Sequence, residues 1–179
     1  MTAALVFMCH DRLFFCGIAA AAVHESGHIL AIWLCRGCFL REINIGALGI
    51  RITAGGRSFR PVIILAGVTA NLVLTLLSLP FLSFEPYRDY VIELIAANLC
   101  LAACNILPVE PLDGGSLLRY FTELKLSQET ADKVVFIVSL CAIVPLAAAG
   151  LFAVMQSRGN FSLLILCLWL LAGILRRYI

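Results

Sequence analysis

The chain of 179 residues is 62% hydrophobic and 13% charged, and its mean hydropathy is +1.01. A soluble domain usually contains about 45–50% apolar and about 25% charged residues, so this composition excludes a water-soluble globular protein and predicts an integral membrane protein. The formal net charge of +2 gives no indication of nucleic-acid binding, and we expect no nucleic-acid partner.

Five apolar runs have the character of membrane-spanning helices, each of which needs about 20 apolar residues to cross about 30 Å of hydrocarbon. The predicted spans are Leu13–Cys35, Pro61–Ser83, Asp89–Leu107, Val134–Met155 and Phe161–Leu175. The last is short, but Arg176 and Arg177 can extend their charged ends to the interface. The opening run Thr2–Cys9 is too short to cross. The predicted fold is therefore an all-α membrane protein, a polytopic helical bundle of about five transmembrane helices in one domain, residues 1–179.

The first span contains His24-Glu25-Ser26-Gly27-His28. Residues i and i+4 share one face of a helix, so His24 and His28 can both offer imidazole nitrogens to a single ion. The pattern H-E-x-x-H is typical of zinc peptidases, with the glutamate as general base. The alternative is a polar cluster that stabilises helix packing, but ionisable residues at membrane depth are costly and indicate function by default. We predict that His24 and His28 bind Zn²⁺ and that Glu25 is the catalytic base.

The segment Cys38–Thr53 follows this span and differs from the other connections. Its isoleucines alternate with polar or small residues, and Gly46 and Gly49 bracket a turn. This pattern predicts a short membrane-associated β-hairpin directly after the first span. An irregular interfacial loop is the alternative.

A catalytic zinc site takes three protein ligands and a water molecule. His10 is the only other histidine, and it precedes the first span on the opposite face, so the third ligand should be a carboxylate. Three acidic residues are candidates for this role: Asp113, which we favour, and Glu42 and Glu110. Glu42 lies in the predicted hairpin beside Arg41, where a solvated ion pair is the alternative use. Glu110 stands between two prolines.

Asp113 is the carboxylate that the sequence favours. The third span ends in Asn-Ile-Leu-Pro-Val-Glu-Pro-Leu-Asp-Gly-Gly, where Pro108 and Pro111 break the helix and the pair Gly114-Gly115 lets the backbone turn sharply. Irregular backbone at membrane depth persists only where protein or a water-filled cavity satisfies it. The first and third spans both run inward, so Asp113 can meet the histidines in the cytoplasmic half of the bilayer.

Two stretches, HESGH and NILPVEPLDGG with its Leu-Asp-Gly core, together resemble the site-2 protease family of intramembrane zinc metalloproteases. The resemblance is greatest to the compact branch with the stage IV sporulation protease, which processes a membrane-tethered sigma-factor precursor. It implies a catalytic core of about residues 13–122, with accessory spans at about residues 134–179. It also implies that His24, His28 and Asp113 bind zinc and that Glu25 is the general base.

The resemblance extends to two asparagines. Asn105 matches the family asparagine that helps to position substrate near the metal. The second span contains Gly67-Val-Thr-Ala-Asn71, in which Val68 replaces the family's proline while Asn71 is retained. Both asparagines are therefore candidates for positioning substrate. Hydrogen bonding between helices is the alternative for Asn71, and for Asn98, which shares a helix face with Asn105.

The basic residues are unevenly divided between the two sides of the predicted bundle. One side has only Arg12, Arg88 and Arg158. The other has the remaining ten: Arg36, Arg41, Arg51, Arg57, Arg60, Arg119, Lys125, Lys133, Arg176 and Arg177. Because cytoplasmic loops are enriched in Lys and Arg, this second side should face the cytoplasm. We expect an integral protein of a bacterial cell membrane whose active site lies toward the cytoplasmic side.

The predicted function is that of an intramembrane zinc metalloendopeptidase, which cleaves a peptide bond in or near a membrane-embedded segment of its substrate in regulated intramembrane proteolysis. The expected partners are the lipid bilayer and a membrane-tethered protein, such as a transcription-factor precursor. The alternative is a non-catalytic membrane metal-binding or transport protein. A transporter needs polar ligands through both leaflets, whereas these cluster on one side. Three histidines are too few for a histidine-rich di-iron oxygenase.

Overall fold

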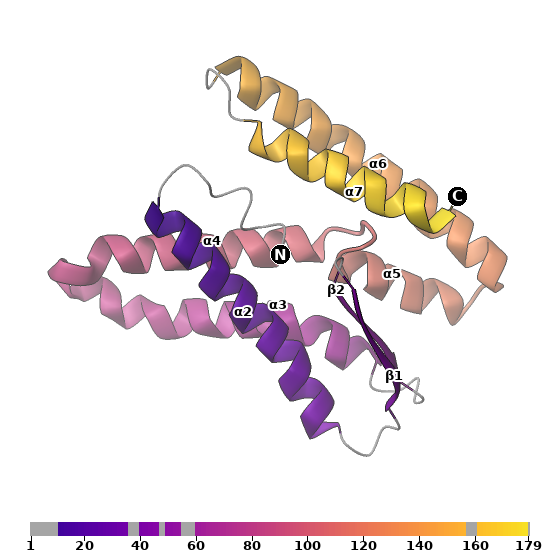
Figure 1. The fold of residues 1–179 in the computed structure, drawn as a ribbon, viewed down its shortest axis with the longest axis horizontal. Coiled ribbons are helices and arrows are strands. Elements are labelled where there is room, and N and C mark those ends of the chain that lie inside the picture. The colour runs from indigo at the N-terminus through magenta and orange to yellow at the C-terminus, as the bar shows by residue number, and fades with distance from the viewer. Residues whose placement is uncertain (1–10, 36–39, 47–48, 55–59, 157–160, 179) are drawn as a thin grey trace. The chain divides into compact units, whose positions relative to one another are not determined.

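The structure is a computed structural model that describes residues 11–35, 40–46, 49–54, 60–156 and 161–178 (Figure 1). These residues fall into two compact units, the first reaching Asn105 and the second starting at Ile106. The predicted opening run Thr2–Cys9 and His10 lie outside the described residues. The boundary between the units falls at the end of the third predicted span, within the predicted catalytic core.

The first unit contains three long helices, two strands and two short 3₁₀ helices. They are α2 (Asp11–Leu34), β1 (Leu40–Gly46), β2 (Gly49–Ala54), α3 (Arg60–Ser78), η2 (Leu79–Ser83), η3 (Glu85–Tyr87) and α4 (Arg88–Ile106). The helix α2 crosses α3 closely because Gly27 has no side chain (Figure 1). A Cβ at Gly27 would lie 2.6 Å from the Ala66 carbonyl oxygen. Ala20 of α2 packs with Ala97 and Leu101 of α4 in a small apolar core.

The strands β1 and β2 pair antiparallel, with Ile43 opposite Ile52 and Ile45 opposite Ile50. The pairing is irregular between Leu40 and Glu42. Both strands fall almost entirely inside the segment Cys38–Thr53, where the sequence predicts a hairpin. Their side chains lie outside what the structure describes, so the side chain of Glu42 is not placed.

The second unit contains α5 (Asp113–Glu123), α6 (Gln128–Gln156) and α7 (Ser162–Tyr178). The long helix α6 contacts both other helices, and α7 lies alongside it (Figure 1). Gly150 of α6 faces Leu164 of α7, where a Cβ would lie 3.0 Å from Leu164 Cδ2. The sequence did not predict α5 as a helix.

Among the described residues, four helical stretches are long and apolar enough to cross a membrane: Arg12–Leu34, Arg60–Ser83, Glu85–Ile106 and Gln128–Gln156. Large apolar side chains such as Leu76, Val144 and Leu168 lie exposed on the helices, as contact with lipid requires. The fifth predicted span corresponds to α7, which has 17 residues and a length of about 25 Å. This is shorter than the hydrocarbon layer, so four spans are supported and the fifth stays a prediction.

Candidate metal centre

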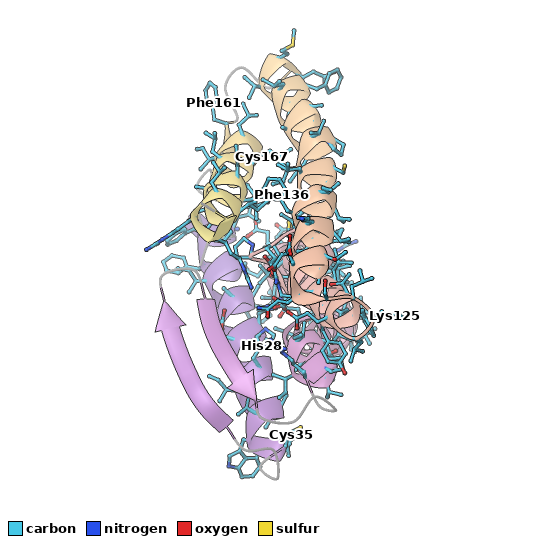
Figure 2. All side chains as sticks on the ribbon, turned by 90° about the vertical axis from the view of Figure 1, so that its right-hand side faces the viewer. His28, Cys35, Lys125, Phe136, Phe161 and Cys167 are labelled. Carbon is cyan, nitrogen blue, oxygen red and sulfur yellow. The ribbon has the colours of Figure 1, made fainter. Side chains whose placement is uncertain are left out.

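The two histidines of the H-E-x-x-H pattern lie one turn apart on α2. His28, labelled in Figure 2, lies about two turns before Cys35, the residue that follows this helix. His24 is buried and His28 is half-buried. Their Nε2 atoms are 3.2 Å apart. Two nitrogens that bind one tetrahedral zinc at about 2.0–2.1 Å stand about 3.3 Å from each other. The pair therefore has the spacing that a shared zinc ion requires.

The backbone of α3 sets the tautomer of His28. The Nδ1 atom of His28 lies 2.8 Å from the carbonyl oxygen of Ile63. A carbonyl oxygen can only accept a hydrogen bond, so Nδ1 carries the proton and the neutral ring presents a lone pair at Nε2. Metal-binding histidines commonly donate their other ring nitrogen to such a carbonyl, which fixes the ring orientation. The donor chemistry of this pair thus fits a metal ion.

Gly67 of α3 packs directly against both imidazole rings. A Cβ at this position would lie 2.5 Å from His28 Nε2 and 2.6 Å from His24 Cε1. No side chain fits there without displacing the rings. The same helix therefore supplies a hydrogen-bond acceptor at Ile63 and, one turn later, the space that the two nitrogens occupy.

Glu25 follows His24 on α2 and is half-buried. The residue is therefore neither enclosed in a packed core nor fully exposed. A general base has to reach a water molecule, which this degree of burial permits.

Asp113 is the first residue of α5 and is half-buried. The helix α4 ends at Ile106, and a short segment follows in which Leu112 N donates to Val109 O at 2.8 Å. The peptide bond between Glu110 and Pro111 is cis. The prediction that Pro108 and Pro111 end the third span agrees with this structure.

The prediction that Gly114 and Gly115 turn the backbone sharply is wrong, because both lie in the helical first turn of α5. Their role is to permit close packing against the preceding segment. A Cβ at Gly114 would lie 2.1 Å from the carbonyl oxygen of Ile106, and one at Gly115 would lie 2.5 Å from Glu110 N. The glycine pair thus lets the start of α5, and Asp113 with it, lie against the segment that follows α4.

Of the two competing carboxylates, Glu110 is engaged elsewhere. Its Oε1 lies 2.5 Å from Arg119 Nε and 3.0 Å from Arg177 Nη1, and its Oε2 accepts from Arg119 Nη2 at 3.1 Å. A carboxylate held by two guanidinium groups has little capacity left for a metal ion. The side chain of Glu42 lies outside the described residues. The structure therefore favours Asp113 over Glu110 as a ligand.

The asparagines differ in their surroundings. Asn71 lies one turn after Gly67 on the same face of α3 and is fully buried, and neither of its amide atoms has a hydrogen-bond partner among the described residues. The amide nitrogens of Asn98 and Asn105 donate to Leu94 O at 2.8 Å and to Leu101 O at 3.0 Å, both within α4. Both amide nitrogens thus bond within their own helix. The amide nitrogen of Asn98 does not make the interhelical hydrogen bond that was the alternative for this residue.

The structure thus brings His24, His28 and Gly67 together in the first unit. Asp113 begins α5 in the second unit, and its joining the histidines stays a prediction. The sequence did not predict the contributions of Ile63 and Gly67. Ile63 acts through its backbone oxygen, and Gly67 leaves room for the two rings because it has no side chain.

Comparison with known proteins finds a likeness in fold but none in sequence. No protein-family model matches the chain, and no curated protein matches its sequence. A solved structure, Site-2 Protease from Methanocaldococcus jannaschii, is similar in fold with a TM-score of 0.69. The match covers 94% of this chain and 78% of that one, at 19% sequence identity. At this identity the likeness shows a shared fold, and function has to be argued from the residues of this chain.

Proposed function

We propose that this chain is an intramembrane zinc metalloendopeptidase of the site-2 protease type. The observation that carries the proposal is the His24–His28 pair, with Nε2 atoms 3.2 Å apart and the proton of His28 held on Nδ1 by Ile63 O. Such a pair suits a shared cation, because His28 presents a lone pair at Nε2 and the Nε2 atom of His24 lies where it can offer a second lone pair to the same ion. The fold likeness to a protein named a site-2 protease supports the same function.

In this proposal His24, His28 and Asp113 would hold the zinc ion. Zinc, when bound, supplies a Lewis acid and lowers the pKa of a water molecule to about 7. Glu25 accepts a proton from the attacking water and returns it to the nitrogen of the leaving amine. The substrate is a membrane-tethered protein, for which a transcription-factor precursor is our leading candidate.

The substrate has to present an extended backbone, since the carbonyls of an intact helix are hydrogen-bonded. We propose that an edge of the β1–β2 hairpin holds the unwound segment by strand addition and that Asn105 and Asn71 position its backbone. We further propose that the active site faces the cytoplasm of a bacterial cell. The stage IV sporulation branch remains the relative that the sequence motifs favour.

The experiment that tests this function compares the purified parent protein with Glu25→Gln. Each is reconstituted with a panel of tethered single-span substrates, and bound zinc is measured in the same samples. The substitution keeps the size of the side chain and leaves all three proposed ligands in place. We expect stoichiometric zinc in both proteins, cleavage by the parent, and a loss of cleavage of at least about 10²-fold in the variant.

Glu129→Gln is the matched control, because Glu129 lies on the exposed start of α6, where its side chain is 82% exposed. It should cleave like the parent. Cleavage at the parent rate by Glu25→Gln would contradict the role of this residue. A zinc-loaded parent that cleaves none of the substrates would favour the alternative of a non-catalytic metal-binding or transport protein.

A further inference from the structure

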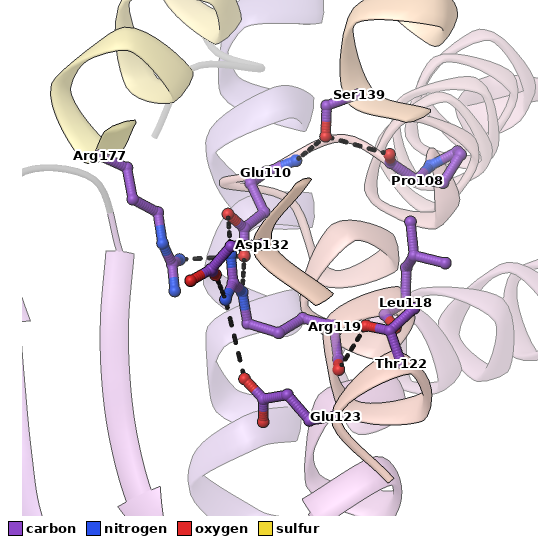
Figure 3. A network of polar contacts seen from close by, with 9 residues as sticks. All are labelled: Pro108, Glu110, Leu118, Arg119, Thr122, Glu123, Asp132, Ser139 and Arg177. Carbon is purple, nitrogen blue, oxygen red and sulfur yellow. Dashed lines mark hydrogen bonds and ion pairs between the residues drawn. The ribbon is translucent and has the colours of Figure 1, made fainter. Parts of the chain in front are cut away.

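A cluster of charged side chains surrounds Arg119 in the second unit, drawn in Figure 3. Arg119 pairs with both oxygens of Glu110, at 2.5 and 3.1 Å, and its Nη1 also pairs with Asp132. Glu123 lies 3.7 Å from the same Nη1, and Arg177 pairs with Glu110 from the opposite side at 3.0 Å. Three helices and the segment after α4 thus contribute to one network.

The centre of the network is buried, with side-chain exposures of 8% for Arg119 and 3% for Glu110. Removing two charges from water is expensive, and well-packed apolar residues in their place are often neutral or stabilising. A buried ion pair is therefore weak evidence for a stabilising role, and better evidence for a role in fixing one arrangement of the chain. The two arginines are already matched by three carboxylates, so the cluster does not form an anion-binding site.

The network fixes the segment Leu107–Leu112, which leads into Asp113. Ser139 of α6 holds the same segment, since its Oγ donates to Pro108 O at 3.4 Å and accepts from Glu110 N at 3.3 Å (Figure 3). On α7, Gly173 lies against Pro111, where a Cβ would be 3.1 Å from the ring Cδ. Gly173 and Arg177 are one turn apart, so one face of α7 contacts the segment.

We propose that Arg119 and Glu110 are positioning residues for the metal ligand Asp113, and that α6 and α7 act through them. Glu110 is three residues before Asp113, and the first turn of α5 packs on the backbone of Val109 and Glu110. Any shift of Glu110 is therefore passed to Asp113. The inference rests on the proposed function, because it takes Asp113 as a zinc ligand. It assigns the accessory helices α6 and α7 a part in metal binding.

The test measures zinc affinity by chelator competition, and the absorption spectrum of the Co²⁺-substituted protein, for the parent, Glu110→Gln, Arg119→Lys and Arg119→Gln. Residues that orient metal ligands typically contribute 10–100-fold in affinity. We expect about a tenfold loss or more for Glu110→Gln and Arg119→Gln, with an altered Co²⁺ spectrum. Arg119→Lys keeps the charge but loses the two-pronged geometry, so its affinity should lie between those of Arg119→Gln and the parent.

Two controls accompany these variants. Glu129→Gln breaks the exposed Glu129–Lys133 pair, 2.8 Å long and on the same helix as Asp132, and should leave affinity and spectrum unchanged. Thermal unfolding of the zinc-free proteins checks the fold, since a purely structural role would lower stability without changing the Co²⁺ spectrum of the folded protein.

Arg177→Gln is a further variant for the case in which the buried substitutions prevent folding. It removes only a peripheral charge, on a side chain that is one-third exposed, so we expect it to fold. It should lower affinity severalfold.

Asp113→Ala separates the failure of this inference from that of the proposed function. If Asp113→Ala keeps parental zinc affinity, Asp113 is not a ligand, and the zinc site of the proposed function fails as drawn. If Asp113→Ala loses zinc while the folded Glu110, Arg119 and Arg177 variants all keep parental affinity and spectra, only the positioning role is overturned. Loss of affinity in both sets supports it.

Discussion

Gly67 packs against the rings of His24 and His28 from the neighbouring helix α3, and it allows a direct test of the histidine pair. A Cβ at this position would overlap His28 Nε2 at 2.5 Å. Gly67→Ala should therefore push the rings apart and lower zinc affinity by about 10–100-fold. Alanine also favours the helix by about 1 kcal/mol, which offsets part of the crowding, so we expect the protein to stay folded. Zinc titration and thermal unfolding of the purified variant measure the two effects.

Gly150→Ala is the control for this substitution. It adds the same methyl group inside a helix, but the nearest atom, 3.0 Å away, is the mobile end of the Leu164 side chain. Zinc affinity should not change. Parental affinity in Gly67→Ala would mean that the nitrogens do not bind metal in the arrangement described for this pair.

At the residue scale, the sequence predicted the candidate ligands and the candidate base, and it missed the residues of α3 that contact the two histidines. His24, Glu25 and His28 are recognisable because their spacing is local to one helix turn. Ile63 lies 35 residues from its partner His28 and acts through its backbone oxygen. Gly67 acts by having no side chain. Neither contribution leaves a chemical signature that a single sequence can reveal.

The connection from α4 to α5 shows the same limit at the scale of elements. Pro108 and Pro111 predicted the end of the third span at Leu107, one residue from its end at Ile106. The helix α5 was missed because it opens with Asp-Gly-Gly, and each glycine disfavours a helix by about 1 kcal/mol relative to alanine. Close packing against the preceding segment, at distances that only glycine permits, outweighs this preference.

Gly115→Ala tests that packing. The added Cβ would lie 2.5 Å from Glu110 N and from Val109 C, which are backbone atoms and cannot rotate away. Overpacking of this kind costs about 1–3 kcal/mol, more than the helix preference of alanine returns. We expect a lower unfolding midpoint in detergent, whereas Gly150→Ala should unfold at or above the parental temperature. An unchanged midpoint for Gly115→Ala would show that the segment can move away from α5.

At the scale of the whole molecule, the direction of each helix decides on which side of the membrane the candidate site lies. The guanidinium group of Arg12 lies over the ring of Tyr90, 4.7 Å from its centre. These residues stand at the starts of α2 and α4, so the two helices begin at the same end of the first unit. The predicted parallel course of the first and third spans agrees with this contact.

The charge bias behind the predicted orientation changes in one respect. Arg119 and Arg177 were counted among ten basic residues on the cytoplasmic side, but both pair with Glu110. Buried or paired arginines are poor topological signals, because orientation is set by Lys and Arg in the loops beside the spans. Without these two arginines, eight basic residues lie on the predicted cytoplasmic side and three on the other side, which still favours the same orientation.

Cysteine labelling from the two sides of intact cells tests this orientation. In a background without the eight native cysteines, single cysteines replace Glu85, between η2 and α4, and Glu129, at the start of α6. Both side chains are more than four-fifths exposed and accessible to reagent. Only one predicted crossing, α4, separates them.

We expect Glu85→Cys to react with membrane-impermeant reagent from outside, and Glu129→Cys to react only after the cells are opened. The reverse pattern would place the candidate site toward the outside, and reaction of both from one side would mean that α4 does not cross the membrane.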